Sequence, residues 1–554
     1  MTPAEPSPDL RQVWDAIVVG TGPGGAAAGQ ALAAAGKTVL FCEEGGPDSA
    51  GQAELRGSYP ELLAPRRGAV LGLGPQDADL LRRAGRYQHP VHDHSGRRPR
   101  DFIPFIGAGP GGSSALYGMA LERFLPQDFA PAAQHPDAQG STLVDSWPIG
   151  YADLAPFYTD AEQRFRVRGE IDPLINQRGG GAQAAHLLPA PALSPQAQAM
   201  SDLLRSRGLH PYRLPAACDA VPGCESCQGY LCPRPCKNDA NRILLQPALR
   251  SPGSHLLAGC RVHALASDGR RVTGVQAEYR GQALTLQART VILAAGALQT
   301  PLILLRSRSS AHPDGLGNRS GMVGRNLMRH FVDLYVVQPD SHLPAFDNRQ
   351  KEIAFNDFYL GEAGKLGTVQ SFGSLPPAPM LVGSLQDDLR AGAWPALAAV
   401  MPLLRPFLLP MLGRMMGGAM ILASIAEDLP FADNDVRPAG NSGGAVTLHY
   451  TLKPEAQRRV ARFRTLMRPV LQGRRWRLLP QADNNQRLAH VCGTCRMGDD
   501  PALSVLDRHN RVHGLDNLFV VDSSCFPSSG GTNPTLTIVA NALRVGGLLA
   551  QGMP

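Results

Sequence analysis

Residues 17–46, IVVGTGPGGAAAGQALAAAGKTVLFCEEGG, contain a short apolar strand, a glycine turn, an alanine-rich helix and a second apolar strand that ends in an acid. This order predicts a βαβ unit that binds a dinucleotide. Gly20 allows the tight turn out of the strand, Gly22 lets backbone N–H groups approach a pyrophosphate, and Gly25 lets the helix pack closely on the strand. Glu43 follows at roughly the ~20-residue spacing from which an acid reaches a ribose hydroxyl.

A second glycine cluster stands in FIPFIGAGPGGSSALYGMALERF at 102–124. Gly111 and Gly112 precede Ser113 and a helix-like run, an arrangement that presents backbone N–H groups to an anion. Two glycine-built anion sites fit one dinucleotide. Residues 47–100 between them are rich in Arg, Gly, Pro and His, and we expect a covering surface loop there.

The length of 554 residues predicts two or more domains, because single cores stop growing near ~250–300 residues. Strand-like alternation at 255–305 and a helical pattern at 453–471 indicate an α/β protein, α+β overall. We expect a Rossmann-like nucleotide-binding domain, discontinuous in sequence, and a second, substrate-binding domain built on an antiparallel sheet and helices. The predicted pieces are 1–150, 216–335 and 488–554 for the first domain, and 151–215 and 336–487 for the second.

Charge and termini narrow the class of protein. The net charge of +7 is spread without any run of five Lys or Arg residues, which does not indicate a nucleic-acid partner. The first 16 residues, MTPAEPSPDLRQVWDA, lack the basic and apolar regions of a signal peptide. We therefore expect a cytoplasmic protein, and a periplasmic one only if a partner carries it across the membrane.

The segment 394–426, WPALAAVMPLLRPFLLPMLGRMMGGAMILASIA, is apolar almost throughout. Arg405, Arg414 and three prolines interrupt the ~20 apolar residues that a membrane-spanning helix needs. Three interpretations remain open from sequence: a buried core or dimer contact, the lining of an apolar substrate passage, and a surface that dips into a bilayer.

Two further blocks lie near the C-terminus: HVCGTCRMG at 490–498 and RVHGLDNLFVVDSSCFPSSGGTNPTLTIVANALRVGGLLA at 511–550. With the N-terminal glycine unit, GPGGSSALYGM, AGALQTPLILLRS and VGRNLMRH at 323–330, they stand in the order seen in the glucose-methanol-choline (GMC) oxidoreductases, which the chain resembles. The resemblance implies FAD, a two-domain fold with a discontinuous FAD domain, and oxidation of an alcohol by hydride transfer to flavin N5.

In that family the first of these blocks provides a histidine over the flavin, which falls at His490, and the second polar partner falls at Asn533, where many relatives carry histidine. A side chain with a pKa near ~6.5 suits a base that takes the hydroxyl proton around neutral pH. Asn533 can hydrogen-bond the same hydroxyl but cannot take its proton. The remaining conspicuous histidines are expected to be structural or surface residues: His89, His92, His94, His330, His509 and His513.

Further positions are expected to contact the cofactor. Asp522 and Ser523 resemble the strand-end segment whose backbone touches the cofactor phosphates in relatives, and Pro534 is expected to begin a helix after a polar cap. The complete set of expected FAD contacts is Gly20, Gly22, Gly25, Glu43, Gly111, Gly112, Ser113, Val262, Asp522, Ser523, Asn533, Pro534 and Thr535.

A cysteine cluster, CDAVPGCESCQGYLCPRPCK at 218–237, holds five cysteines. Cys227, Cys232 and Cys236 resemble the three-cysteine motif of GMC dehydrogenase subunits that carry an iron–sulfur cluster. Zinc ligation and a thiol-rich or partly disulfide-linked structural loop are the other interpretations.

The leading functional hypothesis is an FAD-dependent oxidoreductase that acts on the hydroxyl of a sugar, polyol or lipophilic alcohol. Its electron acceptor, whether oxygen, a quinone or a cytochrome, stays open, as does a peripheral membrane contact or a partner subunit. One alternative is the catalytic subunit of a membrane-coupled dehydrogenase with iron at the cysteines. Another is a flavin-bearing lyase or a non-redox FAD scaffold.

Some relatives attach FAD covalently to a histidine just after the second glycine cluster. The corresponding stretch here, GGSSALYGM, contains no histidine, so we expect non-covalent FAD. Acid precipitation should leave a colourless protein pellet and release the yellow cofactor into the supernatant. A pellet that stays yellow contradicts this prediction.

Overall fold

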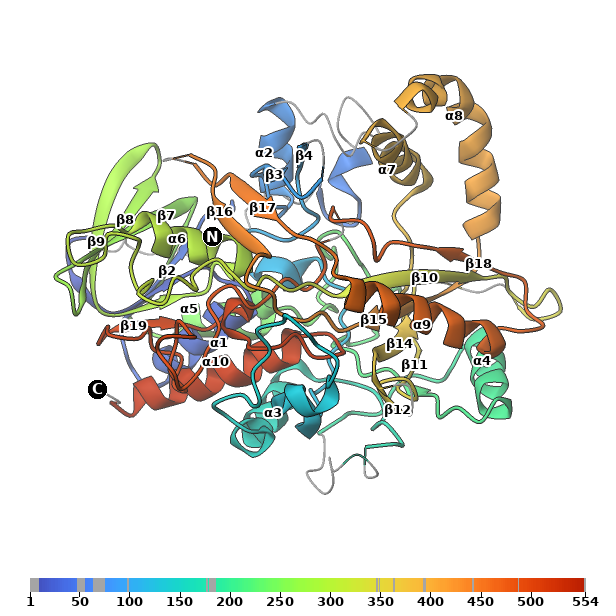
Figure 1. The fold of residues 1–554 in the computed structure, drawn as a ribbon, viewed down its shortest axis with the longest axis horizontal. Coiled ribbons are helices and arrows are strands. Elements are labelled where there is room, and N and C mark those ends of the chain that lie inside the picture. The colour runs from blue at the N-terminus through green and yellow to red at the C-terminus, as the bar shows by residue number, and fades with distance from the viewer. Residues whose placement is uncertain are drawn as a thin grey trace.

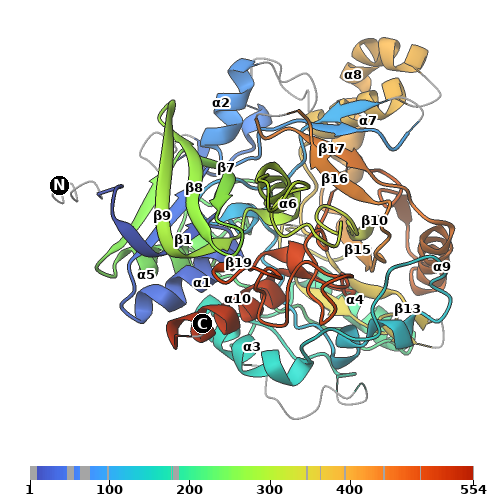
Figure 2. The ribbon, with the colours of Figure 1, turned by 60° about the vertical axis from the view of Figure 1, so that its left-hand side comes forward.

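Two β-sheets, each flanked by helices, lie side by side in this computed structural model (Figure 1). The structure describes residues 9–46, 55–62, 75–96, 99–175, 178, 186–344, 347, 349–361, 364–391, 395–440, 443–486 and 488–552. Figure 2 shows the first sheet from another side, with α1, α10 and α3 grouped along one of its faces.

The first sheet has the strand order β6-β2-β1-β9-β8-β7, and β19 also pairs with β9. β1 runs parallel to both of its neighbours, β2 and β9, and parallel strands need helices over their faces. The strands are β1 Val13–Val19, β2 Val39–Glu43, β6 Ser254–Ala258, β7 Cys260–Ser267, β8 Val272–Tyr279, β9 Gln282–Leu293 and β19 Leu518–Val520. Three distant parts of the chain thus build one sheet.

Glycines set the close packing of helix α1, Pro23–Ala34, on this sheet. Gly20 turns the chain out of β1 with φ of +95°, and a Cβ there would lie 2.4 Å from the carbonyl oxygen of Ala294. A Cβ on Gly25 would lie 2.0 Å from the carbonyl oxygen of Gly20. Since backbone atoms cannot yield easily, only glycine fits where the helix meets the turn.

The second sheet is antiparallel, with the order β18-β10-β15-β14-β11-β5. Its strands are β5 Tyr212–Arg213, β10 Phe331–Val337, β11 Ile353–Phe355, β14 Gly367–Ser371, β15 Met420–Ala426 and β18 Trp476–Leu479. Helix α9, Pro454–Val470, buries Val460, Phe463 and Met467 in one core with Phe331 and Tyr335 of β10. The predicted fold, a discontinuous nucleotide-binding domain beside an antiparallel second sheet, is confirmed.

Smaller elements complete the fold. A four-stranded sheet has the order β16-β17-β3-β4, and β12 pairs with β13. The strands are β3 Val91–Asp93, β4 Arg100–Phe102, β12 Leu360–Gly361, β13 Gly364–Lys365, β16 Asp435–Pro438 and β17 Val446–His449. The remaining helices are α2 Pro75–Arg83, α3 Tyr151–Phe165, α4 Pro195–Ser206, α5 Gln246–Leu249, α6 Gly296–Arg306, α7 Ala378–Ala391, α8 Pro395–Met416 and α10 Thr535–Ala550.

Residues 47–100 are not simply the covering loop that the sequence suggested. Their described parts contain α2 and β3, and β3 pairs in parallel with β17 and antiparallel with β4. Residues 47–54, 63–74 and 97–98 lie outside the described residues.

The apolar segment 394–426 divides between helix α8 and strand β15. The helix continues through Pro402, Pro406 and Pro410. By length and composition α8 could cross a membrane. Only 11% of its most apolar 18-residue stretch is buried inside the protein. The buried-core interpretation is therefore wrong for α8, although β15 is fully buried.

The contact at Gly25 predicts that Gly25→Ala destabilises the protein by about 2–3 kcal/mol, because a helix and a turn must move apart. The matched control is Gly547→Ala in α10, where a Cβ would meet nothing within 4 Å and a small gain of about 0.5–1 kcal/mol is expected. Urea unfolding of the three proteins measures the difference. Equal stability of Gly25→Ala and wild type would show that the close approach is not rigid.

Candidate active site

The two glycine clusters meet at the end of β1. Gly111 N–H donates to the carbonyl oxygen of Thr21 at 3.2 Å, and a Cβ on Gly112 would lie 2.7 Å from Gly22 Cα. A Cβ on Gly22 would itself meet only Gly112 Cα, at 3.9 Å. The structure thus brings both predicted anion sites into one backbone cradle that no side chain fills.

Glu43 lies beside this cradle with its carboxylate buried. Oε2 accepts from Thr21 N–H at 2.9 Å and from Thr21 Oγ1–H at 2.7 Å, and Oε1 accepts from Gly45 N–H at 2.9 Å. A carboxylate offers about four acceptor positions. One position is left over, which suits a ribose hydroxyl.

Asp522 connects the cradle to the C-terminal blocks. Its Oδ2 accepts from Gly296 N–H at 2.9 Å and from Thr300 Oγ1–H at 2.5 Å. Burial raises the pKa of this carboxyl. The next residue, Ser523, accepts through its carbonyl oxygen from Gly493 N–H at 3.2 Å, in the block that begins at His490. The Asp522 carboxylate thus joins the start of α6 to the C-terminal segment, and Ser523 joins that segment to the block of His490.

A cavity of 330 Å³ adjoins the second glycine cluster and is lined by Gly109, Gly112 and Lys237, among others. The open cradle, the spare acceptor on Glu43 and this cavity fit a bound dinucleotide. Two further expected contacts, Ser113 beside Gly112 and Val262 on β7, stay predictions. Ser113 is exposed and accepts from Gly107 N–H at 3.1 Å, while Val262 is buried on β7 opposite Ala277 of β8.

His490 and Asn533, the two expected catalytic side chains, lie together. Nδ2 of Asn533 is 3.4 Å from Nε2 of His490. Asn533 precedes Pro534, which caps α10, and its buried Oδ1 has no hydrogen-bond partner among the described residues. His490 has φ of +57°, an uncommon backbone conformation for a non-glycine residue that is associated with functional sites.

His330 fixes which nitrogen of His490 carries the proton. Nε2 of His330 lies 2.9 Å from the carbonyl oxygen of Gly530 and 3.2 Å from that of Ser529, so it must donate. Burial lowers the pKa of His330, which leaves Nδ1 as an acceptor. That Nδ1 is 2.8 Å from Nδ1 of His490, which therefore carries the hydrogen. Nε2 of His490 is left unprotonated and faces Asn533.

Sequence analysis placed His330 among the structural or surface histidines, and the structure adds that it is buried and contacts His490. Its position at the end of VGRNLMRH was the available signal, because that block belongs to the family pattern. Other histidines have local partners: His89 pairs with Glu44 at 2.7 Å, and His92 with Asp101 at 2.8 Å.

His490 is held neutral. Burial lowers its pKa well below 6.5, and its neighbours His330 and Lys351 lower it further, because a positive charge on either disfavours the imidazolium. Lys351 stands just before β11 and reaches the second glycine segment, since a Cβ on Gly118 would lie 2.2 Å from its Nζ. Burial lowers the pKa of Lys351 to about 8. Sequence reasoning missed Lys351, which no motif marks.

Two buried glutamates support the loop that carries Asn533. Glu427 accepts from Gly530 N–H at 3.1 Å, and Glu122 accepts from Thr532 Oγ1–H at 3.1 Å. Burial raises the pKa of Glu122 to about 7. Neither residue was expected from sequence.

A buried ion network lies behind the same loop. Nζ of Lys365 is 2.5 Å from Asp128 and 2.7 Å from Glu427, and all three side chains are inaccessible to solvent. Tyr359 O–H donates to Asp128 at 2.7 Å and accepts from Gly531 N–H at 2.9 Å. Burial opposes ionisation of Glu427, yet Lys365 and His135 lower its pKa well below the usual range.

The cysteine cluster does not form a metal site among the described residues, where no three His, Cys, Asp or Glu side chains are arranged to hold an ion. Sγ atoms of Cys218 and Cys224 are 3.5 Å apart, as are those of Cys232 and Cys236. All ten cysteines of the chain are free thiols. Cys227, Cys232 and Cys236 pack together in a small apolar cluster.

The arrangement agrees with known proteins. Residues 99–332 match the N-terminal domain, and residues 439–542 the C-terminal domain, of the family described as GMC oxidoreductase. The chain is 30% identical to 6'''-hydroxyparomomycin C oxidase from Streptomyces lividus, over 98% of this chain and 92% of that protein. It is 26% identical to 2-methyl-1,2-propanediol dehydrogenase from Mycolicibacterium austroafricanum, over 97% of this chain and 95% of that protein. The solved structure of pyridoxine 4-oxidase from Mesorbium loti has a TM-score of 0.63 at 21% identity, with 98% of this chain and 100% of that chain covered.

The geometry around His490 predicts a neutral imidazole with hydrogen on Nδ1 down to a pH well below 6.5. Lys351→Met should raise the pKa of His490, because a nearby positive charge disfavours the imidazolium. NMR titration of ¹⁵N-labelled histidine, assigned with His490→Gln, reports both the tautomer and the pKa. Lys453→Met, which removes a surface lysine paired with Asp433 at 2.5 Å, is the control and should change neither. Hydrogen on Nε2 at neutral pH would contradict the arrangement.

Proposed function

This chain belongs to the GMC oxidoreductase family, and from that premise we propose that His490 is the base that takes the hydroxyl proton of an alcohol while Asn533 orients the hydroxyl. The family assignment makes the protein an FAD-dependent oxidoreductase that acts on CH–OH groups. The observation that carries the proposal is the unprotonated Nε2 of His490, 3.4 Å from the amide of Asn533.

FAD, when bound, supplies the acceptor for the hydride that leaves the alcohol carbon. The residues proposed to hold it are those of the glycine cradle, Gly20, Gly22, Gly111 and Gly112, with Glu43 at the ribose. Their support is the shared backbone cradle and the spare acceptor on the carboxylate.

His490 accepts the hydroxyl proton, and His330 holds the His490 ring in place. The hydroxyl O–H bond breaks, the proton moves to Nε2 of His490, and the carbon–oxygen bond of the substrate becomes a carbonyl. Nδ1–H of His490 stays bonded to Nδ1 of His330 throughout, so the ring cannot turn away. Because burial and Lys351 disfavour the imidazolium, His490 releases its proton readily and returns to the neutral state.

Asn533 positions the substrate without exchanging a proton. Its amide N–H groups can donate to the hydroxyl oxygen, and its buried Oδ1 has acceptor capacity to spare. Glu122 and Glu427 hold the loop beneath it, which keeps the amide in reach of His490.

We propose a small molecule with a primary or secondary hydroxyl as substrate, drawn from sugars, polyols and lipophilic alcohols. Relatives named as a hydroxyparomomycin oxidase and a propanediol dehydrogenase support a hydroxyl-bearing small molecule as the substrate. Since one is named an oxidase and the other a dehydrogenase, they leave both oxygen and other electron acceptors open. A panel of alcohols, each assayed with oxygen and with an artificial dye, identifies the substrate and the acceptor together. A protein fully loaded with FAD that no alcohol reduces would instead indicate a lyase or a non-redox scaffold.

Replacing the base provides the test. His490→Gln should slow flavin bleaching by an alcohol, in anaerobic stopped flow, by roughly 10²–10⁴-fold, the contribution of a positioned base. FAD content should stay at the wild-type level. His92→Gln, which removes a half-buried histidine paired with Asp101, should bleach at the wild-type rate. Bleaching of His490→Gln as fast as wild type would end the base assignment.

A further inference from the structure

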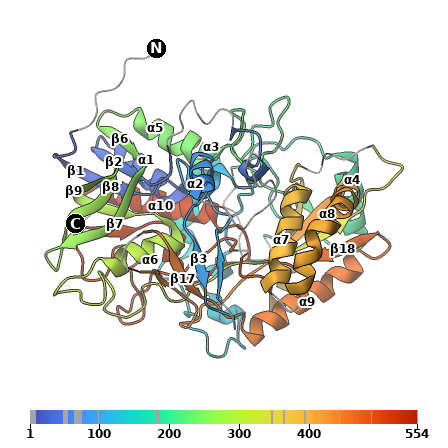
Figure 3. The ribbon, with the colours of Figure 1, turned by 90° about the horizontal axis from the view of Figure 1, so that it is seen from above.

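Helices α7 and α8 form a hairpin, which lies at the upper right of Figure 1 and whose two helices lie side by side in Figure 3. Six of the eleven large apolar side chains that are exposed in the described ranges lie on α8. They are Leu397, Val400, Leu403, Leu404, Phe407 and Met411. Phe407 and Leu403 are 77% and 75% exposed. An apolar patch of this concentration marks an interaction surface.

Spacing gathers these side chains on one side of the helix. Leu403, Phe407 and Met411 follow one another at four-residue intervals, and Val400 and Leu404 form a parallel row. Helix α7 contacts the body, where Asp388 pairs with Arg100 at 3.4 Å and accepts from Asn484 at 3.1 Å. The apolar rows therefore point away from the protein.

Both ends of the hairpin rest on the second sheet. It is inserted between β14 and β15, which pair directly, with Ser371 opposite Leu422. Gln338 of the sheet donates through Nε2 to the carbonyl oxygen of Met415, in the last turn of α8. A helix that crossed a bilayer would have to leave its end on the far side. The hairpin as a whole starts and finishes on the same sheet, so it can enter a membrane surface but not span it.

Charge indicates what the surface meets. The segment 395–416 contains Arg405 and Arg414 and no Asp or Glu. At the base of the hairpin, Gln338 N–H donates to the carbonyl oxygen of Arg475 at 2.9 Å. The side chains of Arg475, just before edge strand β18, and of Arg477, on that strand, are exposed. Apolar rows together with exposed arginines match an anionic lipid surface, in which acyl chains take the apolar side chains and phosphate groups pair with arginine.

A second copy of the chain fits less well. In a two-fold contact the same patch meets itself, so the arginines of one α8 would face those of the other with no acid on the helix to pair with them.

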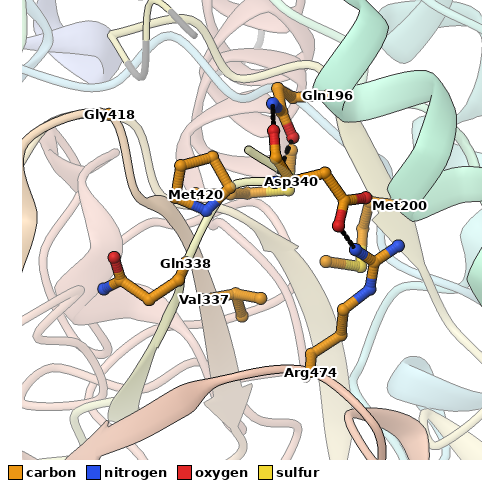
Figure 4. A pocket seen from close by; sticks show the side chains of 9 residues that line it. Gln196, Met200, Val337, Gln338, Asp340, Gly418, Met420 and Arg474 are labelled. Atoms are coloured by element: carbon orange, nitrogen blue, oxygen red, sulfur yellow. Dashed lines mark hydrogen bonds and ion pairs between the residues drawn. The ribbon is translucent and has the colours of Figure 1, made fainter. Parts of the chain in front are cut away.

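Figure 4 shows the small pocket where α8 joins β15. Its polar groups pair with one another, as Asp340 does with Gln196 at 3.0 Å and with Arg474.

We propose that the α7–α8 hairpin docks this enzyme on anionic membranes, with the rows of α8 dipping into the lipid and Arg475 and Arg477 contacting phosphate groups. The proposal is independent of the base assigned above.

Sedimentation with vesicles tests it. The purified protein should bind vesicles of phosphatidylcholine mixed with phosphatidylglycerol. Leu403→Asp/Phe407→Asp should weaken that binding by at least about tenfold, since two large apolar side chains no longer enter the lipid. The matched control is Ile171→Asp/Leu503→Asp, which places the same change at apolar residues that are 46% and 56% exposed outside the hairpin. This control should bind like wild type.

A charge variant separates the contribution of the arginines to vesicle binding from that of the apolar side chains. Arg475→Gln/Arg477→Gln should weaken binding to the mixed vesicles and leave the weaker binding to pure phosphatidylcholine unchanged. Light scattering after size exclusion runs alongside. Three results would overturn the proposal. The wild-type protein could fail to bind either kind of vesicle, or the hairpin and control variants could bind equally well. The third is a dimer that Leu403→Asp/Phe407→Asp separates, in a protein that does not bind vesicles.

Discussion

The buried ammonium of Lys365 is the interaction on which the site depends. It lies between Asp128, from the chain that follows the second glycine cluster, and Glu427, at the end of β15. Glu427 in turn accepts from Gly530, and the tyrosine that donates to Asp128 accepts from Gly531. Removing one partner of such a buried pair costs about 3–5 kcal/mol, because the other charge stays buried and unpaired. One cation thus fixes three distant segments behind the loop of Asn533.

That loop in turn determines the chemistry of His490. The carbonyl oxygens of Ser529 and Gly530 oblige His330 to donate, and His330 then obliges His490 to present a bare Nε2. A carboxylate in place of His330 would raise the pKa of His490 and stabilise the imidazolium. A neutral histidine fixes the tautomer without adding negative charge, so His490 stays an unprotonated base.

Motifs with a backbone purpose could be predicted, whereas contacts between side chains of distant segments could not. Gly20, Gly25 and Gly112 stand where only glycine fits, and that requirement is visible in the spacing itself. His490 and Asn533 came from the family resemblance rather than from any local pattern. The roles of His330, Lys351 and Glu122 were missed, because they arise only when the two sheets meet. For α8, residue type predicted apolar contact, but sequence could not tell a buried helix from an exposed one, since both have the same composition.

The hairpin also has a consequence for how such an enzyme can be built. Strands β14 and β15 pair from Gly367 opposite Ala426 to Ser371 opposite Leu422, so the sheet is already closed beneath residues 372–419. Those residues amount to an accessory module on a complete scaffold, and a short reverse turn in their place would leave the ladder intact. Where the enzyme resides in a cell and what it oxidises there can thus change separately, by exchange of one module.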